Sequence, residues 1–174
     1  MKPIDFIHIC LDEQRLHAYS ADALVFTMPV STALNGPGEQ NGSGCTPRGL
    51  HVIRARIGAG MPLGAVFRGR RWTGEVWDAT LHAAYPGRDW ILTRILWLSG
   101  CEKGVNRLGA VDTFRRYIYL HGTPDTEPMG IARSHGCIRL RNSDMLTLFN
   151  ALAKQCFVQI TQHAGQALRL PLRT

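Results

Sequence analysis

The chain has 174 residues, of which 45% are hydrophobic and 19% charged, a composition that excludes a disordered or fibrous protein. This length predicts a single globular domain, residues 1–174, with a substantial core. The formal net charge is +7, but no run of five or more cations occurs. The basic residues therefore favour a solvated basic surface over a nucleic-acid-binding site.

The first half of the chain is predicted to form short strands separated by turns. The expected strands are 4–11, 16–20, 23–29, 50–57 and 65–67. The segment 35–44 is rich in glycine and predicts a surface loop, and Gly69-Arg70-Arg71 predicts a basic turn.

The second half contains the most apolar run, 91–98, which predicts a central strand. Further strands are expected at 115–120 and 157–160, and the tail to Thr174 is left without a prediction. Asn142, Ser143 and Asp144 supply helix-capping chemistry, and apolar residues then recur at helical spacing, so one main helix is expected over about 143–154. Many short strands and one helix indicate a mostly-β domain, either a sandwich or an open barrel.

Chemistry-bearing residues are concentrated between positions 119 and 142. Two His-Gly pairs, His121-Gly122 and His135-Gly136, lie in this stretch, and Cys137 follows the second pair directly. Thiol-based acyl transfer requires a thiolate, an imidazole within hydrogen-bond reach and N–H groups directed at the developing oxyanion. We therefore expect Cys137 to be the nucleophile, with a pKa depressed by the imidazole and backbone dipoles, and His121 to be the base.

Most of the remaining residues of the stretch have two interpretations. His135 either transfers a proton or holds the turn by bonding the backbone. The Gly136 and Cys137 N–H groups could form an oxyanion hole. Ser134 is expected to fix the loop or contact substrate. Arg139 either binds a substrate carboxylate or faces solvent together with Arg141.

The segment His121-Gly-Thr, then Gly130, then Ser134-His-Gly-Cys-Ile-Arg-Leu140, resembles the catalytic motif of the YkuD-type L,D-transpeptidases. The turn at Thr46-Pro47-Arg48-Gly49 and the segment 112–119 are similar to other parts of that family, and the resemblance covers most of the chain. It implies the fold of the L,D-transpeptidase catalytic domain. It also implies that Cys137 pairs with His121, which the Gly122 carbonyl orients, with no cofactor or metal.

The resemblance further implies a reaction on peptidoglycan tetrapeptide stems. Cys137 would attack the bond between the L-centre of a diamino acid and the terminal D-alanine, and form an acyl-enzyme. Release by water would make the protein an L,D-carboxypeptidase, and release by an amine would make it an L,D-transpeptidase that cross-links the wall or tethers proteins to it. We expect hydrolysis of soluble muropeptides in peptidoglycan recycling.

Compartment is inferred from the termini and the thiols. Five cysteines without regular spacing argue against a disulfide framework. The amino terminus shows no secretory signal, and no apolar run approaches membrane-spanning length. We therefore expect a cytoplasmic protein with no membrane or nucleic-acid partner; removal of an export signal would make it periplasmic.

Two other classes of protein were weighed. His121, His135 and Cys137 are residue types that ligate zinc, although their spacing matches no zinc motif. A non-catalytic peptidoglycan-binding module is the second alternative, and the intact Cys and His pair argues against it.

Overall fold

Ten strands of this computed structural model form one sheet, and the structure describes residues 3–168. The sheet order is β3-β2-β1-β10-β4-β7-β5-β6, and β8 joins β7 to β9. The strands are β1 (Ile4–Cys10), β2 (Arg15–Ser20), β3 (Ala23–Pro29), β4 (Gly49–Ile57), β5 (Ala65–Arg68), β6 (Arg71–Val76), β7 (Ile91–Gly100), β8 (Tyr119–Thr123), β9 (Ile138–Arg141) and β10 (Leu152–Thr161).

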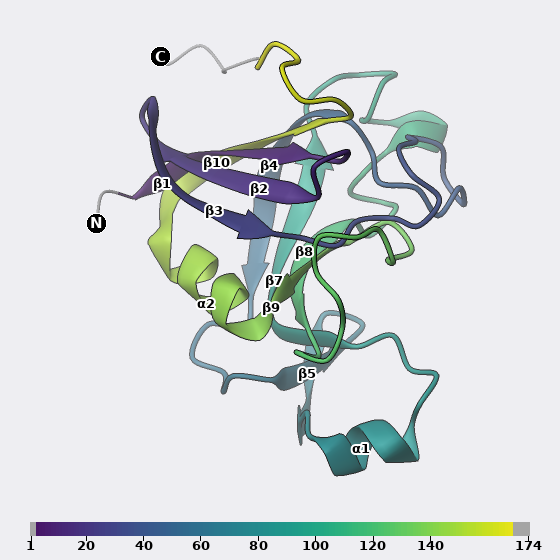
Figure 1. Cartoon of the computed structure of the whole chain (residues 1–174). Helices are drawn as coiled ribbons and strands as arrows, with labels where there is room; N and C mark the ends of the chain where they lie inside the picture. Colours follow the sequence, from purple (N-terminus) through teal and green to yellow (C-terminus); the bar gives the residue numbers. More distant parts are fainter. Residues whose placement is uncertain (1–2, 169–174) are drawn as a thin grey trace.

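Strand β7 is the centre of the fold, as the apolar run at 91–98 predicted. It pairs antiparallel with three strands, β4, β5 and β8, along different parts of its length. Among the strands of the described residues, only β1–β10 and β8–β9 pair in parallel. In Figure 1 the strands β1, β2, β3 and β10 lie in the upper part of the view, β4 runs beside β7, and β5 with the helix α1 (Ala79–Ala84) lies below them.

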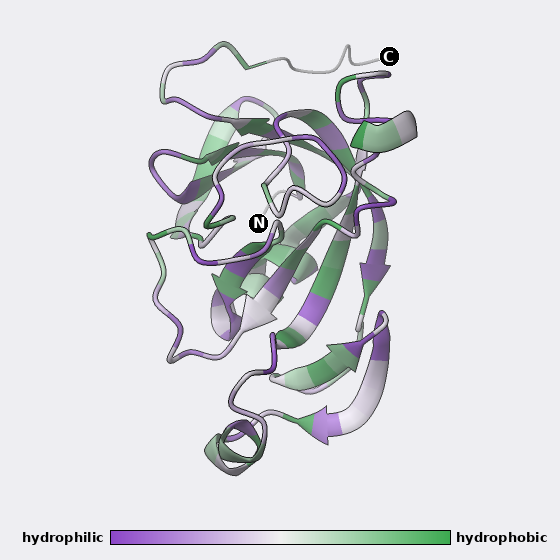
Figure 2. Cartoon of the chain, turned by 90° about the vertical axis from the view of Figure 1, so that its right-hand side faces the viewer, coloured by the Kyte–Doolittle hydropathy of each residue, from purple (hydrophilic) through white to green (hydrophobic). Residues whose placement is uncertain are grey.

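The main core lies between the two halves of this curled sheet. Fully buried side chains come from strands at both ends of the chain and from the helix α2 (Asn142–Ala151), and they include Ile4, Ile7, Leu16, Leu96, Leu120, Ile138, Leu140 and Met145. Figure 2 shows hydrophobic residues along the strands and hydrophilic ones in most connecting loops. The predicted mostly-β class, a sandwich or open barrel with one main helix, is confirmed.

The helix begins near its predicted position but ends earlier, at Ala151 instead of 154. Leu152 has extended backbone angles (φ −68°, ψ 135°) and starts β10 at once. The predicted cap is also wrong, because Arg141 occupies the N-cap position and the Asn142 side chain turns into the sheet. There its amide accepts a hydrogen bond from Thr93 Oγ1 and donates one to the Thr123 carbonyl.

The predicted strand at 115–120 is wrong over its first part. Residues 114–117 form a turn, which the Asp112 carboxylate stabilises by accepting hydrogen bonds from the N–H groups of Leu108 and Arg115. Strand β8 begins at Tyr119, so His121 lies inside the strand and not at its end. The strand β6 and the short helix α1 were not predicted at all.

A buried histidine gives the fold a pH-dependent stability. His51 is fully buried in β4, with Nδ1 3.0 Å from the Gly49 carbonyl oxygen and Nε2 3.1 Å from Thr113 Oγ1. Burial lowers the pKa of His51 to about 4. The unfolded chain therefore takes up a proton near its ordinary pKa of about 6.5, whereas the folded protein does not until near pH 4.

We expect the free energy of unfolding to fall as the pH drops through this window, by roughly 3 kcal/mol from this residue. Urea unfolding of the wild type and of His51→Gln, at about pH 7 and about pH 4.5, measures the effect. The variant is expected to be less stable at pH 7 and to lose less stability on acidification. An identical acid-induced loss in both proteins would contradict the assignment.

Candidate active site

The parallel pairing of β8 with β9 brings the two predicted catalytic residues to one face of the sheet. In this register His121 lies opposite Arg139, and Leu120 lies opposite Ile138. Cys137 immediately precedes Ile138, which places it beside Tyr119 in the register. Since side chains alternate along a strand, His121, Arg139 and Cys137 share the face opposite the main core.

Two backbone groups fix the sulfur of Cys137. The Tyr119 N–H donates to Sγ at 3.4 Å, and the thiol donates to the Tyr117 carbonyl at 3.4 Å. The side chain is partly exposed and packs against a small apolar cluster that includes Ile95 and Trp97. The thiol is thus held in place while part of it remains open to solvent.

His121 is buried and its tautomer is defined by its own strand. Nδ1 donates to the Gly122 carbonyl at 2.7 Å, so Nε2 of the neutral ring keeps its lone pair. Gly122 is required here because a Cβ would lie 2.5 Å from Asn142 Oδ1 and 2.8 Å from the Leu92 carbonyl oxygen. The pairing of His121 with the Gly122 carbonyl, which the family resemblance implied, is therefore present.

Burial controls the ionisation of both groups. Burial lowers the pKa of His121. It raises the pKa of the Cys137 thiol to about 12, although the Tyr119 N–H and the cations Arg139 and Arg116 each lower this pKa in part. The expectation of a depressed thiol pKa is therefore wrong for the unliganded protein. The pair rests as neutral thiol and neutral imidazole at pH 7, a state in which His121 is a competent proton acceptor.

The turn 134–137, called the nucleophile turn because it carries the predicted nucleophile, is held from both sides. The buried Ser134 hydroxyl donates to the Cys137 carbonyl at 2.5 Å and accepts the Gly136 N–H at 3.2 Å. Thr46 Oγ1 donates to the Gly136 carbonyl at 2.9 Å. This placement of Ser134 favours the loop-fixing interpretation over a substrate contact. The oxyanion role of the Gly136 N–H stays a prediction. It would require this N–H to exchange its hydrogen bond to Ser134 Oγ for one to the oxyanion.

Gly136 itself occupies a conformation that only glycine adopts easily, with φ at 135°. A Cβ at this position would lie 3.3 Å from the Cys45 carbonyl oxygen and 3.1 Å from Ile118 Cδ1. The glycine therefore allows the nucleophile turn to pack directly against the loop 35–45.

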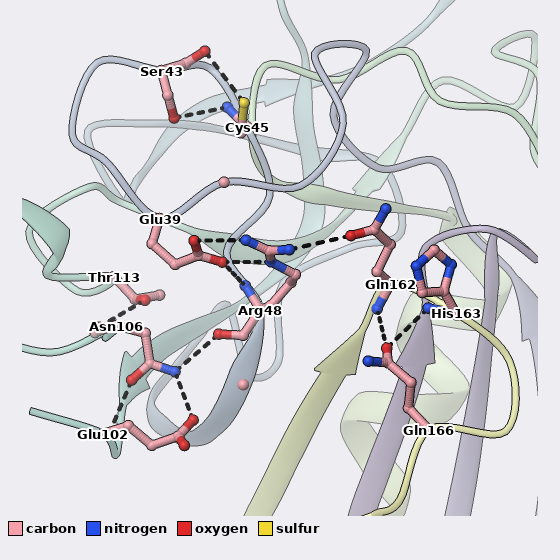
Figure 3. Close-up of polar contacts among 12 residues, drawn as sticks. Glu39, Ser43, Cys45, Arg48, Glu102, Asn106, Thr113, Gln162, His163 and Gln166 are labelled. Atoms are coloured by element: carbon pink, nitrogen blue, oxygen red, sulfur yellow. Dashed lines mark hydrogen bonds and ion pairs between the residues drawn. The ribbon is translucent and has the colours of Figure 1, made fainter. Parts of the chain in front are cut away.

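That loop is anchored by arginines. Arg116 donates to the carbonyl groups of Gly38, Glu39 and Cys45, the last at 2.6 Å. Arg48 forms a two-pronged ion pair with Glu39 and reaches Gln162 on the far side, as Figure 3 shows. The sequence did not decide whether Cys45 lies near the site; its backbone packs against the nucleophile turn.

Arg139 is neither exposed nor free. Its buried guanidinium donates to Asp89 Oδ1 at 2.8 Å and lies 3.9 Å from Glu127 Oε2. Asp89 Oδ2 also lies 3.4 Å from Nδ1 of the exposed His135. The solvent-facing interpretation of Arg139 is therefore wrong. Its Nη2 and Nη1 face the carboxylates of Asp89 and Glu127, while its buried Nε has no hydrogen-bond partner among the described residues. Arg141, by contrast, is exposed and donates to the Asp125 carbonyl.

A cleft of about 170 Å³ opens at this network, lined in part by Asp89, Glu127, His135 and Arg139. Asp89 was missed by sequence reasoning, because it lies in the loop before β7, about fifty residues from its partners. The Asp89 carboxylate raises the pKa of His121 against the lowering effect of burial. No local motif marks this residue, so only the tertiary structure reveals it.

The described part of the chain contains no set of side chains that could ligate zinc. Among residues 3–168, no group of three or more His, Cys, Asp or Glu side chains could hold a metal ion. No helix within this range is long and apolar enough to cross a membrane.

Comparison with known proteins agrees with this geometry. The family model described as "L,D-transpeptidase catalytic domain" matches residues 4–160. A search of curated proteins found no match. Among solved structures, an L,D-transpeptidase from Xylanimonas cellulosilytica DSM 15894 is similar at a TM-score of 0.52 and 17% identity, covering 92% of this chain and 62% of that one.

Two further structures give the same result. An L,D-transpeptidase from Enterococcus faecium has a TM-score of 0.54 at 13% identity, covering 92% of this chain and 50% of that one. L,D-transpeptidase 3 from Mycobacterium tuberculosis has a TM-score of 0.55 at 14% identity, covering 92% of this chain and 62% of that one. The chain therefore spans less than two thirds of the length of each, and these similarities concern the fold.

Proposed function

The chain belongs to the family of L,D-transpeptidase catalytic domains, and from this premise we propose that it is a cysteine acyl-transfer enzyme acting on peptidoglycan tetrapeptide stems. Cys137 is the nucleophile and His121 the proton carrier. The observation that carries the proposal is the arrangement of these two side chains on one sheet face. There the sulfur is fixed by the Tyr119 N–H, and the Gly122 carbonyl sets the histidine tautomer.

The acylation step follows from the resting protonation states. Rotation about the Cβ–Sγ bond redirects the thiol proton from the Tyr117 carbonyl toward His121 Nε2, which accepts it as sulfur attacks the carbonyl carbon. The tetrahedral intermediate then collapses, the peptide C–N bond breaks, and the imidazolium returns the proton to the leaving amine of D-alanine. A thioester on Cys137 and a neutral His121 remain.

Release of the acyl group uses the same histidine. His121 accepts a proton from the acceptor, the acceptor oxygen or nitrogen attacks the thioester carbonyl, and the sulfur leaves and recovers the proton. Because burial raises the pKa of the Cys137 thiol, little thiolate is present in the free protein at rest. Proton transfer is instead coupled to attack, which makes His121 indispensable.

We favour water as the acceptor, which makes the protein an L,D-carboxypeptidase. Cys137 is partly exposed, so solvent water can reach the acyl group without a binding site for a second peptide stem. One observation favours the alternative, transpeptidation. The half-exposed Asp89 and the partly exposed Glu127 line the cleft of about 170 Å³, and their charge would attract an acceptor ammonium group.

Recycling of soluble muropeptides in the cytoplasm is the physiological role that we propose. The five cysteines, Cys10, Cys45, Cys101, Cys137 and Cys156, are all unpaired. Unpaired thiols are typical of reducing compartments.

The acceptor is tested by incubating purified protein with a soluble tetrapeptide, alone and with excess D-amino acid or a second stem, and identifying the products by mass. We expect tripeptide and free D-alanine in every case, without exchanged or dimeric product. Exchange or dimer formation would show that an amine is the acceptor. Absence of any turnover, with stems containing either diaminopimelate or lysine, would contradict the proposed function itself.

A further inference from the structure

The turn between β5 and β6 places a guanidinium above the rings that border the nucleophile. Gly69 and Arg70 both have positive φ, at 54° and 65°, as in the two-residue hairpin turns that match the strand twist. The Arg70 guanidinium carbon lies 4.8 Å from the centre of the Trp97 ring and 4.9 Å from that of Tyr117. Its Nη1 donates to the Tyr119 hydroxyl at 3.3 Å.

These aromatic residues are the ones that hold the sulfur. Tyr119 supplies the N–H and Tyr117 the carbonyl that contact Cys137 Sγ. Trp97 pairs with Tyr119 across β7 and β8, and their rings meet edge to face at 5.8 Å. Tyr117 is itself 52% exposed and holds a positive φ of 57°, a strained conformation of the kind found at functional sites. Arg70 therefore contacts the side chains of the two tyrosines whose backbone groups bond the Cys137 thiol.

Arg70 has no acidic partner among the described residues, as is also true of Arg116 and Arg141. Within residues 3–168 it forms no ion pair, whereas Arg139 contacts Asp89 and Glu127, and Arg88 contacts Glu75. Its positive charge is positioned by ring faces and one hydroxyl. A guanidinium stacked in this way keeps N–H groups on its edge for a planar, bidentate partner such as a carboxylate.

We propose that Arg70 binds a carboxylate of the acyl-donor stem and so sets substrate specificity. The inference rests on the proposed function, and it assigns to Arg70 the role that the sequence had suggested for Arg139. A stem offers this chemistry from two sources, the carboxylate of the terminal D-alanine and the side-chain carboxylate of diaminopimelate. The first would confine the enzyme to free chain ends, and the second would select diaminopimelate over lysine.

Steady-state kinetics of Arg70→Gln on three substrates tests the proposal: the free-acid tetrapeptide, its C-terminal amide, and a form amidated on the diaminopimelate side chain. Loss of a charge-assisted bidentate contact is expected to lower kcat/KM on the free acid by about 10- to 100-fold, mainly through KM. On the amidated substrate that lacks the carboxylate bound by Arg70, Arg70→Gln and the wild type should have the same kcat/KM. The substrate on which the difference vanishes therefore identifies which of the two carboxylates Arg70 binds.

Several controls separate specificity from structure. Arg71→Gln alters the exposed neighbour in the same hairpin and should leave all three substrates unaffected. Arg70→Lys keeps the charge without the planar fork and should give an intermediate penalty. Because the larger influences that lower the Cys137 pKa are Tyr119, Arg139 and Arg116, the pH profile of kcat should not change in Arg70→Gln.

A failure of the inference on Arg70 can be distinguished from a failure of the proposed function. If wild-type protein turns over no stem, the proposed function fails and this inference fails with it. If wild-type protein is active and Arg70→Gln matches it, or loses the same factor on all three substrates, only the inference on Arg70 is overturned. Thermal unfolding of each variant shows whether a uniform loss reflects damage to the hairpin.

Discussion

Cys137→Ala is expected to lower the rate of D-alanine release by at least ~10⁴-fold, to the background of the uncatalysed reaction. Without sulfur no thioester forms, and no other described thiol has the same contacts with the Tyr119 N–H and the Tyr117 carbonyl. The side chain is only partly buried, so the substitution should leave the fold intact. Product release followed by mass spectrometry, with thermal unfolding as a stability check, measures the effect.

The matched control is Cys45→Ala. Cys45 lies in the loop that packs against the nucleophile turn, but its thiol faces its own loop, where it lies 3.4 Å from the Asn35 carbonyl oxygen. Its removal should change the rate by less than about threefold, since small surface changes seldom alter a site beyond their contacts. Turnover above background in Cys137→Ala, or a comparable collapse in Cys45→Ala, would remove Cys137 from the mechanism.

The second large effect is expected for His121→Gln, with kcat lowered by about 10²- to 10⁴-fold. Glutamine can still donate to the Gly122 carbonyl, but it cannot take the thiol proton. Because burial raises the pKa of the thiol to about 12, loss of the base should slow the formation of nucleophilic sulfur at neutral pH. The loss should therefore appear in kcat and not mainly in KM.

The pH dependence supplies an independent readout for His121. The neutral imidazole is the active form, and burial lowers its pKa below the ordinary 6.5. Wild-type activity should therefore rise with pH through a midpoint below 6.5 and stay level through neutrality, and this limb should be absent from any residual activity of His121→Gln. His135→Gln is the control, since His135 is exposed and contacts Asp89. A loss in His135→Gln as large as that in His121→Gln would contradict the assignment.

Local patterns were sufficient for most strands. The alternation or apolar runs at 4–11, 16–20, 23–29 and 50–57 each correspond to a strand of the structure. Three of these strands, β1, β2 and β4, bury side chains on at least one face, whereas β3 buries only Met28. The helix α1 gave no such signal, since it is six residues long and buries none of them. The strand β6 is mostly exposed and likewise lacks an apolar face.

The errors arose where tertiary contacts outweighed local preference. Asn142 reads as a helix cap, yet its amide bonds Thr93 and Thr123 inside the sheet. Residues 114–117 contain strand-forming aromatics, but the Asp112 carboxylate turns the chain there. The thiol pKa was expected to fall, and burial, which no local pattern records, raises it.

The residues of the candidate site also fall into those that the sequence indicates and those that only the tertiary structure reveals. Cys137, His121 and Gly122 are marked by motif and resemblance, and the sheet brings the side chains of Cys137 and His121 to one face. Asp89 and Arg70 come from other parts of the chain and meet the site through register and hairpin geometry, so no spacing in the sequence could indicate them.

The most direct test of the account is to trap the covalent intermediate. Wild-type protein mixed with the tetrapeptide and quenched in acid within the first turnover should carry the mass of the tripeptide acyl group, and peptide mapping should locate that mass on Cys137. A free enzyme mass throughout an active turnover, or an acyl group on any residue other than Cys137, would contradict acyl transfer through this thiol.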